Sequence, residues 1–405
     1  MSLLPFLSRN APWLAAGGLL TFLSSFGQTF FISIFAGEIR AEFGLSHGEW
    51  GGLYSLGTTV SAGVMIWAGA LTDRWRVRGL GALVLAGLAL ACAMMALNPV
   101  VWFLPVVIFA LRFFGQGMTS HIAVVAMARW FVATRGRALA IATLGFSFGE
   151  AILPLIFVSL LGVVNWHYLW GFAALISLAG VPVLMLLLRH ERTPQSMVTA
   201  QSSVGMFARP WTRAEALRHP LFWIMVPAVL GPSAFNTAFF FHQVHFAEVK
   251  GWTHLELVVF FPIYTGLGIV AMLGSGWALD RWGTGRIMPF TQLPLVLAFV
   301  IFALSTTTFG AFFGFLFLAM TAGATATVVP AFWAEFYGTA HIGAIKALAT
   351  AVMVLGSAIG PGITGLLIDL GIGIERQFIG IAVYFLFATA LMAFGIGRAR
   401  ADLPP

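Results

Sequence analysis

The sequence predicts an all-α membrane protein whose twelve transmembrane helices form two six-helix bundles. Three observations predict this fold: an apolar composition, long apolar runs throughout the chain, and a repeat that relates its two halves. The 405 residues are 60% hydrophobic and 9% charged, whereas charged residues make up about a quarter of an ordinary water-soluble domain. A helix that crosses a bilayer needs about 20 mostly apolar residues. The composition therefore excludes a water-soluble globule.

Twelve apolar runs are long enough to cross the membrane. We expect helices because backbone N–H and C=O groups must find partners within the segment in lipid, and the runs lack the short alternation of a barrel strand. The predicted spans lie near residues 12–36, 47–72, 79–97, 102–128, 136–161, 168–188, 219–246, 255–279, 286–305, 310–334, 342–368 and 376–397.

Lysine and arginine residues predict the orientation of the chain. With the N-terminus in the cytoplasm, seventeen of them fall on the cytoplasmic side and only Arg40, Lys250 and Arg376 on the other. Both termini are therefore expected in the cytoplasm, and the preference for arginine over lysine suggests the inner membrane of a bacterium. The net charge of +7 then reflects topology and not a nucleic-acid-binding surface.

Two features of the first half need little interpretation. The first span lacks a small-residue cleavage site behind a short apolar core, so we expect it to be retained and not removed as a signal peptide. Cys92 is the only cysteine, so no disulfide can form within the chain, and we interpret it as a buried small apolar residue.

A repeat at an offset of 207 residues relates the two halves. The repeat carries Gly69, Asp73, Arg74 and Trp75 to Gly276, Asp280, Arg281 and Trp282, Gly136 to Gly343, Gly149 to Gly356, and Pro154 to Pro361. Internal repeats of this kind are typical of secondary transporters, whose two bundles rock about a central site. We therefore expect an N-terminal bundle over 1–188, a cytoplasmic linker over 189–218 with a short surface helix near 211–218, and a C-terminal bundle over 219–405.

Polar side chains are unevenly distributed among the spans. Spans 3, 6, 9 and 12 are nearly featureless, and the other eight carry polar residues that can line a wet cavity. The residues that we expect to contact a substrate are Arg112, Gln28, Tyr54, Gln116, Asn236, His242 and Tyr264.

The duplicated loops have a distinctive pattern, "GALTDRWRVRG" at 69–79 and "GWALDRWGTGR" at 276–286. They resemble the signature loop of the major facilitator superfamily, G-x-x-x-D-R-x-x-x-R/K. The twelve spans, the central linker and the duplication agree with that resemblance over essentially the whole chain. The resemblance implies a secondary active transporter that works by alternating access.

Within that superfamily the chain is most similar to the monocarboxylate and oxalate–formate transporter group. The similar stretches are "ARWFVATRGRALAIATLGFSFGEAILP" (128–154), "FFFHQVHFAEVKGW" (239–252) and "GAIKALATAVMVLGSAIGPGITGLLID" (343–369). This resemblance implies that the substrate is a small organic anion, a monocarboxylate, moved together with protons. Members of that group generally place a cation in span 1 or span 8, but here only Arg281 stands at the cytoplasmic end of span 8.

The signature loops are the predicted cytoplasmic gate. We expect Asp73 and Arg74 to pair with a neighbouring helix end, as the resemblance implies for this loop. The alternative is that the loop only supplies positive charge to the cytoplasmic side of the membrane. That alternative explains the arginine, but it explains neither Asp73 nor the equivalent Asp280 of the second half. The expected gate residues are Gly69, Asp73, Arg74, Gly276, Asp280 and Arg281.

Arg112 is the most informative single residue. It lies about 15 Å below the outer face at 1.5 Å per residue, where an arginine side chain costs at least about 2.5–3.5 kcal/mol. Glu150 in span 5 falls at a similar depth. Two interpretations remain open: a permanent ion pair that fixes spans 4 and 5, or a carboxyl that takes up a proton when an anion engages Arg112.

Other titratable residues have weaker interpretations. His242 and His245 lie three residues apart near the outer end of span 7, so we expect them to share a helix face. They can relay protons or touch substrate at the outer vestibule, or they form an interfacial pair in polar surroundings. A metal site is disfavoured because no third ligand is nearby. Glu335 and Lys346 flank the loop between spans 10 and 11, either as a gate pair or as surface charge.

Other functional classes fit less well. The alternative within transport is a proton-driven exporter of drugs or hydrophobic metabolites, although Glu150 stands where that group often has the proline of G-x-x-x-G-P. No phosphate-binding loop, metal cluster or nucleophile is recognisable, so we expect neither an enzyme nor a cofactor. The expected partners are a small-molecule substrate, protons and the lipid bilayer, with one chain sufficient for function.

Overall fold

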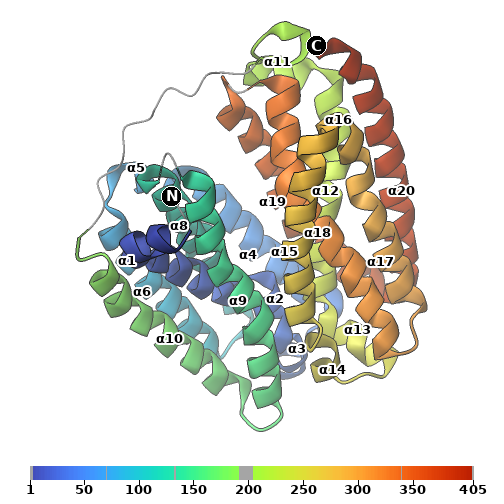
Figure 1. The fold of residues 1–405 in the computed structure, drawn as a ribbon. Helices are drawn as coiled ribbons and strands as arrows, with labels where there is room; N and C mark the ends of the chain where they lie inside the picture. Colours follow the sequence, from blue (N-terminus) through green and yellow to red (C-terminus); the bar gives the residue numbers. More distant parts are fainter. Residues whose placement is uncertain (1–2, 70, 132–133, 191–203, 339, 404–405) are drawn as a thin grey trace. The chain divides into compact units, whose positions relative to one another are not determined.

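The computed structural model is helical along almost the whole chain. It describes residues 3–69, 71–131, 134–190, 204–338 and 340–403, and the side chains of residues 3–5, 73, 135 and 343 lie outside the described part. Two compact units divide the chain, Met1–Thr199 with Phe240–Val244 and Ala200–Phe239 with His245–Pro405 (Figure 1).

The first unit contains six predicted spans, several of them interrupted. Its helices are α1 (Leu3–Leu23), η1 (Ser24–Gly27), α2 (Thr29–Ile32), η2 (Ser33–Phe35), α3 (Ala36–Phe43), α4 (His47–Ala68), α5 (Leu71–Arg74), α6 (Val77–Ala96), η3 (Val101–Phe103), α7 (Leu104–Ala110), η4 (Leu111–Thr119), α8 (Ser120–Trp130), α9 (Arg135–Leu161) and α10 (Trp166–Leu187).

The second unit contains the other six. Its helices are η5 (Met206–Ala208), α11 (Arg213–Arg218), α12 (Pro220–Phe241), α13 (Gln243–Lys250), α14 (His254–Val258), α15 (Phe261–Trp282), α16 (Thr284–Ile287), η6 (Met288–Gln292), α17 (Leu293–Leu304), α18 (Thr308–Tyr337), α19 (Ile342–Asp369), α20 (Ile374–Ala399) and η7 (Arg400–Asp402). The adjoining ends of α12 and α13, within Phe240–Val244, belong to the first unit.

Each of the twelve predicted spans coincides with a helix or an interrupted series of helices. Among the described residues, ten helices are long and apolar enough to cross a membrane, and a pair bent by 47°, Phe6–Gly27 with Thr29–Phe43, makes an eleventh span. The remaining predicted span is α4, whose 22 residues extend about 33 Å but include more polar side chains. The prediction of an all-α membrane fold is confirmed.

The first span begins earlier than predicted. Its helix starts at Leu3 and continues through Pro12, whereas the predicted span begins near residue 12. The polar side chain of Asn10 is accommodated because its Nδ2 donates to the Phe6 carbonyl, 2.8 Å away, one turn earlier. A local side-chain hydrogen bond of this kind removes the reason to end the helix there.

Small residues hold equivalent helices together in the two units. A Cβ atom on Gly145 of α9 would lie 2.0 Å from the Gly18 carbonyl oxygen of α1, and one on Gly360 of α19 would lie 2.2 Å from the Ala234 carbonyl oxygen of α12. Backbones that approach this closely leave no room for a side chain. The small residues of spans 5 and 11 therefore form packing faces of the bundles.

The end of the predicted linker packs onto the second unit. Residues 191–203 lie outside the described residues, but Met206 and Trp211 are buried. The Trp211 backbone N–H donates to the Tyr337 carbonyl, 3.2 Å away, at the end of α18. The short helix expected near 211–218 is α11, capped by reciprocal hydrogen bonds between Thr212 and Glu215.

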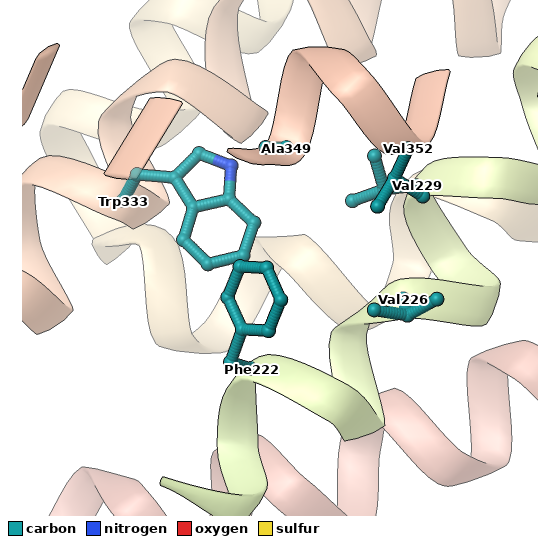
Figure 2. Close-up of a pocket in the computed structure, with 6 residues that line it drawn as sticks. All are labelled: Phe222, Val226, Val229, Trp333, Ala349 and Val352. Carbon is teal, nitrogen blue, oxygen red and sulfur yellow. The ribbon is translucent and has the colours of Figure 1, made fainter. Parts of the chain in front are cut away.

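A small apolar pocket lies within the second unit. Figure 2 shows Phe222, Val226 and Val229 of α12 facing Trp333 of α18 and Ala349 and Val352 of α19. The gap is about 150 Å³ of empty space, too narrow for a water molecule. A water or polar ligand needs several polar partners in a roomier site, so this gap is a packing defect and not a substrate site.

Candidate functional site

The candidate site begins at an interruption of the first span. Helix α1 ends at Leu23 and the 3₁₀ turn η1 that follows it ends at Gly27. Gln28 is then extended, with φ −86° and ψ 153°, before α2 begins at Thr29. A break inside a membrane span leaves backbone groups without their usual helical partners. The carbonyl of Gly27 is therefore available to another donor.

The fourth span is irregular at the same place. Residues Leu111–Thr119 form a π-helix, η4, between the α-helical segments α7 and α8, and π segments are frequent at functional sites. A Cβ atom on Gly27 would lie 2.2 Å from the Leu111 carbonyl oxygen, and one on Gly115 would lie 2.6 Å from the Gly27 Cα. The two irregular backbones therefore touch directly.

Arg112 fills the junction between these two irregular helices. Its Nη1 donates to the Gly27 carbonyl and to Thr29 Oγ1, both 3.2 Å away. The Tyr54 ring centroid lies 5.5 Å from its Cζ, and Tyr54 and Thr29 share a hydrogen bond of 2.5 Å between their hydroxyl groups. Arg112, Thr29 and Tyr54, contributed by spans 4, 1 and 2, thus form one polar cluster, which we call the arginine cluster.

The charge of Arg112 is only partly satisfied within this cluster. The side chain is 2% exposed, and both of its hydrogen-bond acceptors are neutral. Its Nε is buried without a hydrogen-bond partner among the described residues. Burying an unneutralised guanidinium is costly, and it cannot lose its proton. The cluster is therefore suited to receive an anion.

The structure brings several predicted residues of the first unit close to this junction. Gln28 is the extended residue of the span 1 break, and Gln116 lies four residues after Arg112 in η4. Thr29 was not among the predicted substrate contacts, although it joins Arg112 to Tyr54. The available signal was its place in the polar stretch "SSFGQT".

Glu150 lies beside the same break in α9. A Cβ atom on the preceding Gly149 would come within 2.1 Å of Ser25 Oγ, so α9 contacts η1 where span 1 changes direction. In the described part of the chain no ion pair joins Arg112 to Glu150, because Arg112 directs its hydrogen bonds to span 1. The permanent ion pair that we considered between them is therefore not observed.

The two histidines of span 7 do not share one continuous helix. Helix α12 ends at Phe241 and α13 begins at Gln243, so His242 occupies the turn between them, contrary to the prediction. His242 belongs to the segment Phe240–Val244 of the first unit, with its ring centroid 6.1 Å from that of His47. His245 belongs to the second unit, where its Nδ1 lies 3.9 Å from Glu248 Oε2.

The same segment contacts the arginine cluster and span 1. The ring centroids of Phe241 and Tyr54 are 4.5 Å apart. Gln243 Nε2 donates to Ser33 Oγ over 2.8 Å and to the Phe30 carbonyl over 3.2 Å. The sequence alone did not single out Gln243, because a glutamine near a span end has an unremarkable structural explanation.

The remaining predicted contacts, Asn236 and Tyr264, belong to the second unit. Asn236 lies on α12 and its Oδ1 is buried without a hydrogen-bond partner among the described residues. Tyr264, on α15, is 8% exposed. Tyr264 is buried and Asn236 is half-buried, and polar side chains within membrane spans are of the kind that line transport pathways.

Each signature loop is fixed by the fourth span of its own unit. In the first unit Arg129 Nη1 of α8 donates to the Thr72 carbonyl over 2.6 Å. In the second unit Glu335 Oε2 of α18 accepts hydrogen bonds from Thr284, 2.5 Å from its Oγ1 and 3.3 Å from its backbone N. Glu335 is thus tied to the loop after span 8 and is not a simple surface charge.

The predicted gate residues occupy these loops. A Cβ atom on Gly69 would lie 3.4 Å from His121 Nε2 of α8, and one on Gly276 would lie 3.8 Å from Thr327 of α18. Arg74 and Asp280 are exposed, and Arg281 lies with its Cζ 5.8 Å from the Trp277 ring centroid. The Asp73 side chain lies outside the described residues.

Comparisons with known proteins agree on one family. The family model of the Major Facilitator Superfamily matches residues 17–361. A comparison with curated protein sequences finds no match.

Solved structures share the fold at low sequence identity. A bacterial homologue of the human lysosomal transporter Spinster, in an inward-facing and unoccupied conformation, has a TM-score of 0.74 and 16% identity and covers 98% of each chain. The nucleoside transporter NupG has a TM-score of 0.70 and 15% identity over 94% of this chain and 98% of its own.

The Tyr54–Thr29 hydrogen bond predicts a measurable contribution to stability. We expect Tyr54→Phe to lower the unfolding temperature of the detergent-purified protein by about 2 °C, because a lost hydrogen bond costs about 1 kcal/mol. Tyr337→Phe is the matched control, since its buried hydroxyl has no partner among the described residues, and it should not lower the unfolding temperature. Equal behaviour of the two variants would contradict the role assigned to the Tyr54 hydroxyl.

Proposed function

The chain belongs to the major facilitator superfamily, and we propose that this transporter carries a small organic anion, a monocarboxylate, with proton coupling. Transport across the membrane, and not catalysis, is the activity of the family and of the structures that share the fold. The observation that carries the anion proposal is the arginine cluster, in which Arg112 is buried against neutral partners only.

A carboxylate is the ligand that best completes the arginine cluster. Guanidinium groups bind carboxylates through paired hydrogen bonds that are charge-assisted and stronger than neutral ones. The buried Nε of Arg112 has no partner among the described residues, so an incoming carboxylate adds interactions without replacing any that Nε makes. Because Tyr54 covers the guanidinium, the substrate gains access when this ring moves.

Glu150 is the proposed proton carrier. It is half-buried in α9 next to Gly149, whose contact with Ser25 sets it at the level of the span 1 break. A carboxyl in a membrane span is rare and costly, which makes it a candidate for a functional role. In this proposal the carboxyl of Glu150 takes up a proton when the substrate anion engages Arg112, so that proton and substrate move together.

The remaining assignments follow from the sequence and the loop contacts. His242 and His245 are proposed to relay protons, and Asn236 and Tyr264 to contact substrate from the second unit. The signature loops form the gate on the side where Arg129 and Glu335 fix them. Seventeen lysine and arginine residues fall on that side of the membrane in the predicted topology and three on the other. This difference supports a cytoplasmic location for that side and for both termini.

The transported anion is tested by uptake into proteoliposomes. We expect wild-type protein to accumulate radiolabelled two- to four-carbon monocarboxylates. Arg112→Gln should lower uptake about 100-fold, since hydrogen bonds to charged groups contribute about 1.5–3 kcal/mol each. Arg112→Lys keeps the positive charge but lacks the planar guanidinium that can donate two parallel hydrogen bonds to a carboxylate. This variant should lower uptake less than Arg112→Gln does. Arg398→Gln, at an exposed arginine near the end of α20, is the matched control and should transport normally.

Two results would overturn the anion proposal. One is normal monocarboxylate uptake by Arg112→Gln when size-exclusion chromatography shows it to be folded. The other is transport of cationic drugs and not of carboxylates by the wild type, which favours the exporter alternative.

Proton coupling is tested separately with Glu150→Gln. This variant should lose uphill accumulation driven by a pH gradient, because the amide cannot carry a proton, and it should retain exchange of labelled for unlabelled substrate. Glu150→Asp, which keeps a titratable carboxyl, is the control and should retain some accumulation. Full accumulation by Glu150→Gln would contradict the assignment.

A further inference from the structure

An open groove lies on the second unit where the ninth span is interrupted. Span 9 runs through α16 and the 3₁₀ segment η6 before α17 begins at Leu293, and Pro289 and Pro294 fall in the first turns of η6 and α17. Proline removes a backbone donor and interrupts a regular helix. On the other side, α15 and α18 are in close contact, since a Cβ atom on Gly323 would lie 2.3 Å from the Gly268 carbonyl oxygen.

Small residues of α15 form the floor of this groove. Ala271, Gly274, Ser275 and Ala278 line it together with residues of η6, α17 and α18, and its volume is about 460 Å³. From Leu267 to Ala278 the lining extends about 16 Å along α15 at 1.5 Å per residue. This length equals about one leaflet of a hydrocarbon core that is about 30 Å thick.

The rim of the groove is apolar and exposed. Val270, Phe290 and Met320 of the lining are 66%, 64% and 42% exposed. The polar side chain of Thr291 is satisfied internally, because its Oγ1 donates to the Met288 carbonyl over 2.7 Å. An exposed apolar channel of this kind on a membrane-spanning bundle is suited to an apolar ligand such as a lipid chain.

Cations and tryptophans gather at one end of the groove. Beyond Ala278 come Trp282, exposed, and Arg281, whose Cζ lies 5.8 Å from the Trp277 ring centroid. Arg286 is exposed and precedes the lining residue Ile287. Tryptophan and arginine favour the membrane–water interface.

Two carboxylates lie near these cations. Asp280 is exposed on the same turn as Arg281, and Glu335 is engaged by Thr284. Arg400 adds a further positive charge near this loop. Its Cδ lies 3.5 Å from the position that a Cβ atom on Gly285 would occupy. The end of the groove is therefore cationic on balance.

We propose that this groove binds an anionic phospholipid, with one acyl chain along α15 and the headgroup phosphate on Arg281 and Arg286. The apolar lining accounts for the chain, and the adjoining arginines and tryptophans account for a charged headgroup at the interface. The site lies wholly within the second unit, so it does not depend on the identity of the transported substrate.

Native mass spectrometry of the delipidated full-length protein tests the site. Dioleoylphosphatidylglycerol and dioleoylphosphatidylcholine share their chains and differ in charge, and we expect saturable binding of the first at least tenfold tighter than of the second. Gly274→Leu should weaken phosphatidylglycerol binding at least tenfold, because the side chain fills the groove. A Cβ atom on Gly274 meets no heavy atom within 4 Å, so the substitution leaves the fold intact.

Two control variants separate the groove from general lipid contact. Gly380→Leu places the same side chain at an exposed glycine of α20 that also has open space around it, and it should bind phosphatidylglycerol as the wild type does. Arg286→Gln should reduce the preference for phosphatidylglycerol over phosphatidylcholine. Unchanged binding by Gly274→Leu, equal affinity of the wild type for both lipids, or binding that does not saturate would each overturn the proposal.

Discussion

The hydrogen bond from Arg112 to the Gly27 carbonyl is the interaction on which the first unit depends. Two irregular spans meet there, a broken helix and a π-helix, and each leaves backbone groups short of regular partners in a setting without bulk water. Direct contact between Gly27 and Gly115 leaves no space for side chains, and the guanidinium supplies the missing donor. The same arrangement keeps a positive charge inside the membrane, so structural need and the anion recognition that we propose converge on one residue.

The duplicated halves share packing but differ in charge. Gly145 in α9 lies against the Gly18 carbonyl oxygen of α1, and Gly360 in α19 lies against the Ala234 carbonyl oxygen of α12. At the 207-residue offset, however, Ala319 stands where Arg112 stands in the first half, and α18 is α-helical throughout. The signature loops are fixed by a donor in one unit, Arg129, and by an acceptor in the other, Glu335. The two halves thus share a scaffold, and the buried charge of Arg112 has no counterpart at the equivalent position of the second half.

The sequence predicted the spans well because a membrane helix is determined by local composition. The position of Arg112 was also predictable, since a lone arginine in an apolar run must have a reason to be there. Its partners were not, because the break at Gly27 and the π-helix arise from packing between spans that are distant in sequence. The division between α12 and α13 at His242 escaped prediction for a similar reason. Neither residue types nor hydrophobic periodicity mark that turn.

The most direct test of the account compares ligands that differ only in charge. Thermal unfolding of the purified wild-type protein would be followed with acetate, lactate, pyruvate and benzoate and with the amide of each, because a ligand that binds the folded state raises its unfolding temperature. If Arg112 recognises the carboxylate, at least one acid should raise the unfolding temperature while its amide does not. Equal stabilisation by an acid and its amide, or stabilisation by none of the acids, would contradict the assignment of a small monocarboxylate to Arg112.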